Sequence, residues 1–168
     1  MNITLRIPDT LTNTILTDLR RPHAFAYERV GFILCKQTSV PSGFLLLAYK
    51  YIEISDDQYI EDHTVGAKFD SSAIRDGMQA ALSESAAALH VHLHDHVGQP
   101  HMSRTDIREM QALMPCFVNL CPERVHGALV FSVDAAVAKV WGTDLPPKGN
   151  LVSKITSVGA SIRFLGAI

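Results

Sequence analysis

Residues 90–106, HVHLHDHVGQPHMSRTD, hold five of the eight histidines in the chain. Apolar residues and histidines alternate at the start of this stretch, in the order Leu89, His90, Val91, His92, Leu93 and His94. Because successive side chains of a strand point to opposite faces, the alternation predicts a strand with one apolar face and one histidine face. We expect the apolar face to pack in the core and the histidine face to carry the chemistry.

The histidine face supplies residue types that bind zinc. Imidazole and carboxylate groups are ordinary zinc ligands, and a catalytic zinc keeps three protein ligands and one open position. His92, His94 and the later Asp106 would form such a set. A histidine repeat can also be a solvated surface, so the zinc prediction depends on Ser103 and Asp106 following the repeat in order.

The order of these residues resembles the JAMM motif of the JAB/MPN metalloprotease family, HxHx(7)SxxD with a separate glutamate upstream. The matching residues are His92, His94, Ser103 and Asp106. The resemblance implies that the two histidines and Asp106 bind one zinc ion and that Ser103 takes part in catalysis. The chain departs from the family pattern at Asp95, where the family usually has a proline, and in the spacing after the histidine pair.

Two histidine pairs come equally close to the family spacing. Eight residues separate His94 from Ser103, one more than in the pattern, whereas the pair His94/His96 leaves six. We favour His92 and His94, because the alternating strand pattern leads directly into them and His96 falls in a loop that contains glycine and proline. The HxHxDH signature of metallo-β-lactamase-like hydrolases does not fit, because Asp95 follows His94 directly.

Glu28 is the candidate for the upstream glutamate. It stands directly before an apolar run from Val30 to Cys35, and it forms an ExxGxxL arrangement with Gly31 and Leu34. This arrangement resembles the glutamate segment of the family, which also follows a first helix and leads into a core strand. A carboxylate at a strand start is most often solvated surface. Because the histidine motif follows it, we expect Glu28 to be catalytic.

Two further histidines are not expected to bind metal. His63 lies in the polar segment 55–68, which predicts a loop, and is expected at the surface. His126 lies among apolar strand residues and is expected to be a hydrogen-bonded core residue.

The remaining periodicity predicts one α/β domain over residues 1–168. Asp9 or Thr10, Ser71 or Ser72, and Ser103 are expected to cap three helices. The strands on either side of residues 41–43 are expected to pair as a hairpin, and the family resemblance implies a curved mixed β-sheet flanked by helices. Strands are expected at residues 2–7, 30–35, 43–54, 86–94, 125–133, 136–142 and 155–168, and helices at 11–19, 71–85 and 104–115.

The composition is that of a globular domain. The 168 residues are 47% hydrophobic and 19% charged, with a formal net charge of −2, which argues against nucleic-acid and anionic-membrane partners. Apolar runs are far shorter than the roughly 18–20 residues that span a bilayer. The N-terminal sequence MNITLRIPDT lacks the basic start and apolar core of a signal peptide, so we expect a cytoplasmic protein. Cys35, Cys116 and Cys121 form no CxxC pair and are expected to be buried free thiols.

The resemblance implies a zinc-dependent isopeptidase or peptidase that cleaves after the C-terminal tail of a ubiquitin-like protein. Glu28 would then be the general base, and Ser103 would stabilise the oxyanion. Ubiquitin-like proteins or their conjugates are the expected partners. Bacterial members of the family occur beside ubiquitin-transfer-like enzymes, including in antiphage operons, and such enzymes are further expected partners.

Two alternatives stay open at this stage. The first is a non-catalytic binding or scaffold module of the same fold, which the altered spacing and the missing proline support. The second is a hydrolase of a small molecule with a similar zinc site, because the sequence shows no substrate-binding motif.

Overall fold

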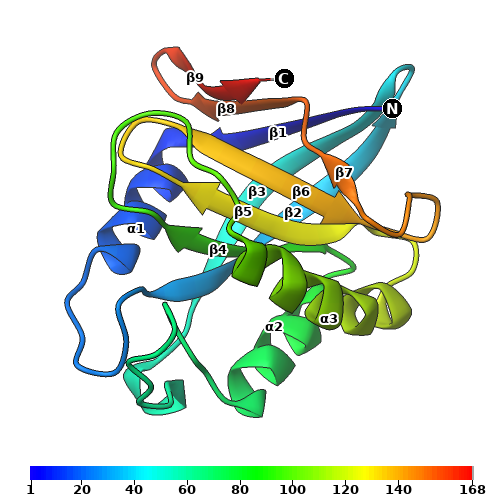
Figure 1. Cartoon of the computed structure of the whole chain (residues 1–168). Coiled ribbons are helices and arrows are strands. Elements are labelled where there is room, and N and C mark those ends of the chain that lie inside the picture. The colour runs from blue at the N-terminus through cyan, green and yellow to red at the C-terminus, as the bar shows by residue number, and fades with distance from the viewer. Residues whose placement is uncertain (168) are drawn as a thin grey trace.

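The computed structural model describes residues 1–167 as a single α/β domain (Figure 1). These residues form three α-helices and nine strands in one mixed sheet, in the order β7-β6-β5-β4-β2-β3-β1-β8-β9. The fold class predicted from the sequence is therefore confirmed. The strands are β1 (Asn2–Pro8), β2 (Val30–Val40), β3 (Gly43–Glu53), β4 (Ala87–Leu93), β5 (His126–Phe131), β6 (Ala136–Trp141), β7 (Asn150–Leu151), β8 (Lys154–Val158) and β9 (Ile162–Ala167), and the helices are α1 (Asp9–Leu19), α2 (Ser71–Ser83) and α3 (Arg104–Leu120).

Helices cover both faces of the sheet. Leu89 of β4 packs in a core that includes Ile15 of α1, whereas its neighbour Ala88 packs in a second core with Ala81 of α2 and Phe117 of α3. Helix α1 therefore lies on one face, and α2 and α3 lie on the other (Figure 1). Among residues 1–167, no helix is long and apolar enough to cross a membrane.

The sheet curls so that its last strand approaches β6. Gly166 in β9 lies so close to Ala136 that a Cβ atom at this glycine would be 2.2 Å from the Ala136 carbonyl oxygen. Only glycine fits such a close approach of two backbones. Ile155 of β8 and Leu165 of β9 pack in the same core as Leu89. The curvature therefore encloses the core on the α1 side of the sheet.

Strand β4 carries the histidine stretch through the middle of the domain. It pairs antiparallel with β2 and parallel with β5. The predicted hairpin of β2 with β3 is confirmed, and β5 pairs antiparallel with β6. Helix α2 crosses over between β3 and β4. Because layers cover both faces of β4, its histidines are held in a buried and rigid part of the molecule.

The prediction of one final strand over residues 155–168 was wrong. This segment forms two strands, β8 and β9, which pair as an antiparallel hairpin. Gly159, Ala160 and Ser161 make the turn, and the Gly159 N–H donates to the Ser161 carbonyl at 3.0 Å. Strand β8 pairs with β1 on its other side, so β9 forms the edge of the sheet. The predicted end of the strand, Ile168, lies outside the described residues.

Two helix caps also differ from prediction. Pro8 occupies the N-cap position of α1 without a side-chain hydrogen bond, and Asp9 instead accepts hydrogen bonds from Ser157 and, at 2.9 Å, from Arg163. A tertiary partner therefore outcompetes the local cap. Helix α2 is capped by the preceding Asp70, whose carboxylate accepts from two backbone N–H groups, and not by Ser71 or Ser72.

The three cysteines are free thiols, as predicted, but only Cys35 is buried. Cys116 is exposed on α3, and Cys121 is partly exposed after its end. The prediction that all three are buried was therefore wrong for two of them, because both lie at the surface of the last helix and its exit turn.

Candidate metal centre

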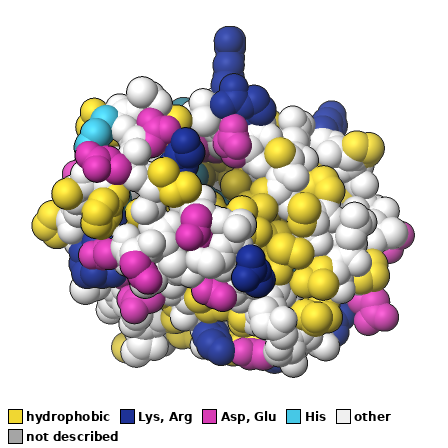
Figure 2. Space-filling view, turned by 90° about the horizontal axis from the view of Figure 1, so that it is seen from below, with side chains coloured by type: hydrophobic (Ala, Val, Ile, Leu, Met, Phe, Trp, Pro, Cys, Tyr) yellow, Lys and Arg dark blue, Asp and Glu magenta, His cyan; other side chains and the backbone are white. Residues whose placement is uncertain are grey.

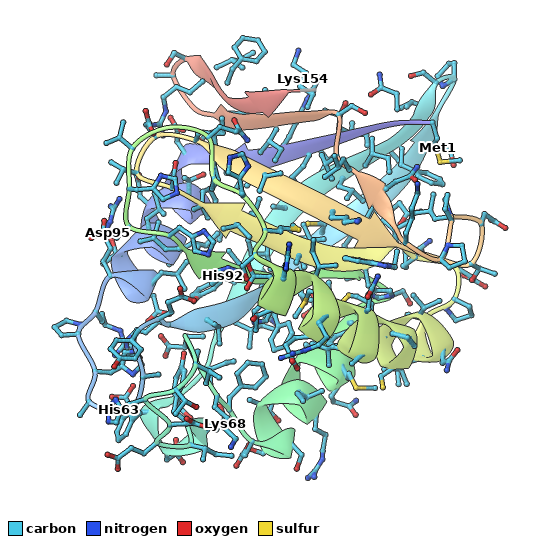
Figure 3. All side chains as sticks on the ribbon, viewed as in Figure 1. Met1, His63, Lys68, His92, Asp95 and Lys154 are labelled. Atoms are coloured by element: carbon cyan, nitrogen blue, oxygen red, sulfur yellow. The ribbon has the colours of Figure 1, made fainter. Side chains whose placement is uncertain are left out.

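The two faces of β4 are divided as the alternation predicts. Leu89 and Val91 belong to the core on the α1 side, and His90 and His92 lie on the other face with Ala88. His92 lies close to the N-terminal end of α3 (Figure 3). The histidine face is therefore directed toward α2 and α3, where the later part of the motif begins.

His94 follows the last residue of β4 and is still held by the sheet. Its backbone N–H donates to the Phe131 carbonyl of β5 at 2.9 Å. This bond continues the strand direction for one more residue, so His94 lies on the same face as His92. The two Nε2 atoms are 3.2 Å apart. Sheet pairing thus brings the two imidazoles together at the carboxyl end of β4.

Asp106 is fixed by the start of α3. Ser103 is the N-cap, and its Oγ accepts a hydrogen bond from the Asp106 backbone N–H at 3.1 Å. The Asp106 carboxylate in turn accepts from the Ser103 backbone N–H at 2.6 Å, which completes a capping box. The predicted cap is confirmed, and it holds the carboxylate rigidly. Asp106 Oδ2 lies 3.7 Å from Nε2 of His92 and 3.9 Å from Nε2 of His94.

The donor atoms of His92, His94 and Asp106 have the separations that a zinc site needs. Ligand atoms at about 2.0–2.1 Å from a tetrahedral zinc ion lie roughly 3.3 Å from one another. The three observed separations, 3.2, 3.7 and 3.9 Å, range from about 0.1 Å shorter to about 0.6 Å longer than this value. Small side-chain rotations would close the difference, so the residues present fit a zinc ion.

Glu28 lies beside this triangle, at the point where the chain enters β2. One of its carboxylate oxygens and the ring nitrogens of His92 and His94 all lie within 4.8 Å of one another. The backbone of Glu28 is held by hydrogen bonds from its N–H to the Gly66 carbonyl and from His23 Nε2 to its carbonyl, both at 2.8 Å. The structure therefore brings Glu28 to the histidine pair, from a position 64 residues before His92.

Two residues that position Glu28 were not singled out from the sequence. Gly66 lies so close that a Cβ atom there would be 2.7 Å from a carboxylate oxygen of Glu28. The absence of a side chain at Gly66 leaves room for the carboxylate, and His23 supports the backbone behind it. Neither residue belongs to a periodic pattern, and both act through contacts between loops, so no sequence signal identified them.

The surroundings favour the charge states that bind zinc. Burial raises the pKa of Asp106, but the contact with His92 and the Ser103 N–H lower it more, so this pKa lies below its usual range. Burial and the neighbouring His92 lower the pKa of His94. A charged carboxylate and a neutral imidazole are the forms that act as ligands.

The other histidines of the stretch lie outside the triangle. His96 is exposed, its Nδ1 is 3.1 Å from the Val97 carbonyl, and its ring centre is 6.2 Å from that of His94. His101 is exposed in the same loop. Gly98 in this loop has a φ of +95°, which favours glycine, and its N–H donates to Asp134 at 2.7 Å. The loop between His94 and Ser103 therefore turns at Gly98 and is tied to the turn after β5.

A cleft of about 610 Å³ opens beside the candidate centre. Glu28, His92 and Asp106 lie at its edge, and it continues between the segment 62–69, α2 and α3. Figure 2 shows this side of the molecule from below, where hydrophobic side chains gather around a hollow with acidic and basic side chains near it. A substrate could therefore reach the triangle from this side.

No protein-family model matches the sequence, and no curated protein matches it.

Proposed function

We propose that this protein is a zinc-dependent isopeptidase or peptidase of the JAB/MPN type. The observation that carries the proposal is the meeting of His92 and His94 from the end of β4 with Asp106 from the start of α3, at separations of 3.2 to 3.9 Å. Glu28 lies beside them, so one ligand triangle and one free carboxylate occur together at the edge of a cleft.

Each residue around the triangle has a chemical task in this proposal. Zinc bound by His92, His94 and Asp106 would lower the pKa of a water molecule to about 7 and polarise the scissile carbonyl. Glu28 would accept a proton from that water and return it to the departing amine. Ser103 Oγ accepts the Asp106 N–H, so its own hydrogen is free to be donated to the oxyanion of the substrate.

The substrate class follows from the family resemblance. We expect cleavage after the C-terminal tail of a ubiquitin-like protein, with that protein or its conjugates as partners. Ubiquitin-transfer-like enzymes from the same operon, including an antiphage operon, are candidate upstream partners, and the cytoplasm is the expected compartment.

The proposal is tested by zinc content and turnover together. Purified protein should contain about one zinc ion per chain, and it should cleave fusions of ubiquitin-like proteins with a reporter in a chelator-sensitive way. Glu28→Gln should abolish cleavage and keep the zinc, because Glu28 is assigned to proton transfer. The matched control is Glu61→Gln, at an exposed glutamate of the loop before Asp62, which should cleave normally. Full activity of Glu28→Gln would reject the mechanism.

A non-catalytic binding module of the same fold is the second candidate. Its support is the departure from the family pattern, with eight residues between His94 and Ser103 and with Asp95 in place of the usual proline. Measurable binding of a ubiquitin-like protein, without cleavage of any fusion in the presence of zinc, would favour the module over the enzyme.

A further inference from the structure

The cleft beside the histidine pair is mostly apolar away from its edge. Its volume of about 610 Å³ falls within the roughly 300–1,000 Å³ of ligand pockets in proteins. Many of the residues that line it are hydrophobic and come from the segment 62–69, α2 and α3. They are Val65, Ala67, Phe69, Ile74, Met110 and Leu113.

Away from Glu28 and Asp106, four charged side chains at the cleft form two ion pairs. Lys68 Nζ lies 3.2 Å from Asp62, and Arg108 lies 3.0 Å from Glu109. All four residues line the cleft. Because each of these four charges has a partner of opposite sign beside it, they offer little attraction to a highly charged ligand. An uncharged and largely apolar occupant is therefore favoured.

His90 also lines the cleft, and its ring has no hydrogen-bond partner among the described residues. His90 is 6% exposed. Its ring stacks on Phe69 with centres 5.8 Å apart. Buried polar groups in proteins nearly always have a partner, so an unpartnered imidazole in a cleft wall points to a ligand with hydrogen-bonding groups. A hydrocarbon ligand would leave it unsatisfied, whereas a peptide carries amide groups beside its side chains.

We infer that this cleft binds a peptide segment of the substrate through a bulky apolar side chain, next to the bond that is cleaved. The identity of the occupant as a peptide rests on the proposed function, and the preference for an apolar side chain rests on the lining of the cleft. The cleft is continuous with Glu28, His92 and Asp106, so a side chain seated in it would place the neighbouring amide at the ligand triangle.

The inference can be tested by binding, without turnover. N-Acetylphenylalaninamide, titrated into methyl-labelled protein, should shift the methyl resonances of Ile74, Met110 and Leu113. The exposed Ile162 and Leu151, which lie outside the cleft, serve as reference methyl groups and should not shift. N-Acetylglycinamide and N-acetylaspartamide should bind at least tenfold more weakly, because they lack the apolar side chain.

A matched pair of variants on α3 locates the binding. Ala112 is exposed and lines the cleft, so Ala112→Trp should fill it and weaken binding of N-acetylphenylalaninamide at least tenfold. Gln111 is an exposed neighbour that does not line the cleft, and Gln111→Trp should bind normally. Absence of shifts at the cleft methyl groups, equal shifts at the reference groups, or equal binding of the aspartamide would overturn the inference.

The two proposals fail separately in these experiments. Probe binding in the cleft without hydrolysis of any fusion would reject the proposed enzyme activity alone. Hydrolysis without probe binding would reject the cleft as the side-chain site alone.

Discussion

His90 and His92 lie on the same strand face, two residues apart, and yet they have different surroundings. His90 is packed between Phe32 and Phe69, with ring centres 5.7 and 5.8 Å away. His92 is close to the end of the strand, where His94 and Asp106 reach its Nε2. Two residues along the strand, a distance of about 6 to 7 Å, therefore separate a side chain in the wall of the cleft from a candidate ligand.

Single alanine substitutions distinguish the two ligand pairs. We expect His92→Ala and His94→Ala to lose most of the bound zinc, because each removes one of three ligands. His90→Ala and His96→Ala should keep it, because neither ring belongs to the triangle of His92, His94 and Asp106. Zinc per chain, measured by mass spectrometry after removal of free metal, checks this expectation.

The His96 variant is the decisive control. If His94→Ala and His96→Ala lose zinc while His92→Ala keeps it, the ligand pair is His94 and His96, with six residues before Ser103. Retention of zinc in all four variants would place the metal elsewhere in the molecule.

At the scale of elements, the first turn of α3 links folding to the candidate chemistry. The hydrogen bonds that begin the helix are the same bonds that orient Asp106 toward the histidines. A capping box and a ligand are alternative explanations of an SxxD pattern, and the geometry here is compatible with both. The cap at α2 offers a comparison, because Asp70 caps that helix at a distance from the triangle.

The two caps should differ in their effect on zinc. Ser103→Ala and Asp70→Ala should each lower the free energy of unfolding by about 1 kcal/mol, because each removes a side-chain cap. Only Ser103→Ala should also weaken zinc binding and lower the rate of cleavage, by roughly a hundredfold or more if Ser103 supports the oxyanion. Denaturant unfolding and zinc titration of both variants provide the comparison.

Equal effects of the two substitutions on zinc and turnover would contradict the role of Ser103. In that case the capping box would be a feature of helix stability alone.

At the scale of the whole molecule, His126 joins three parts of the fold. Its Nδ1 accepts a hydrogen bond from the Ala88 N–H of β4 at 3.2 Å, and its Nε2 lies 3.2 Å from the Cys121 carbonyl after α3. Nε2 therefore carries the ring hydrogen and donates it. Only the neutral ring makes both bonds, because protonation of Nδ1 would remove the acceptor for Ala88. The prediction of a hydrogen-bonded core histidine is confirmed, as is the surface position of His63.

This arrangement makes folding stability depend on pH. Burial lowers the pKa of His126 to about 4, against about 6.5 in an unfolded chain. Below pH 6.5 the unfolded state binds a proton that the folded state does not, so stability falls as the pH falls toward 4. The contribution of His126 at pH 5 should be about 2 kcal/mol smaller than at pH 7. NMR titration of the ring and denaturant unfolding at both pH values measure this.

A substitution at His126 separates its contribution to the pH dependence of the free energy of unfolding from the contributions of other groups. In His126→Asn the side-chain carbonyl can still accept from Ala88 but does not titrate. The stability gap between the natural protein and this variant should narrow by about 2 kcal/mol between pH 7 and pH 5. A constant gap for His126→Asn would show that its ring does not titrate as described.

Local patterns were sufficient for much of the fold and for the candidate site. Alternation determined β4 and its two faces, and the Ser103 to Asp106 spacing determined the start of α3, because both depend on neighbours within one strand or one helical turn. These features are local in the chain, so the sequence alone was able to predict them.

Tertiary structure decided what depends on contacts between distant segments. The Asp9 carboxylate bonds to Ser157 and Arg163 and does not cap α1. Residues 155–167 form two strands, with β8 paired to β1 on one side and to β9 on the other. Gly66 and the unpartnered ring of His90 gained their roles from the loop and helices packed against β4. The periodic pattern of the sequence does not predict such contacts, because they join segments that come together only when the whole chain has folded.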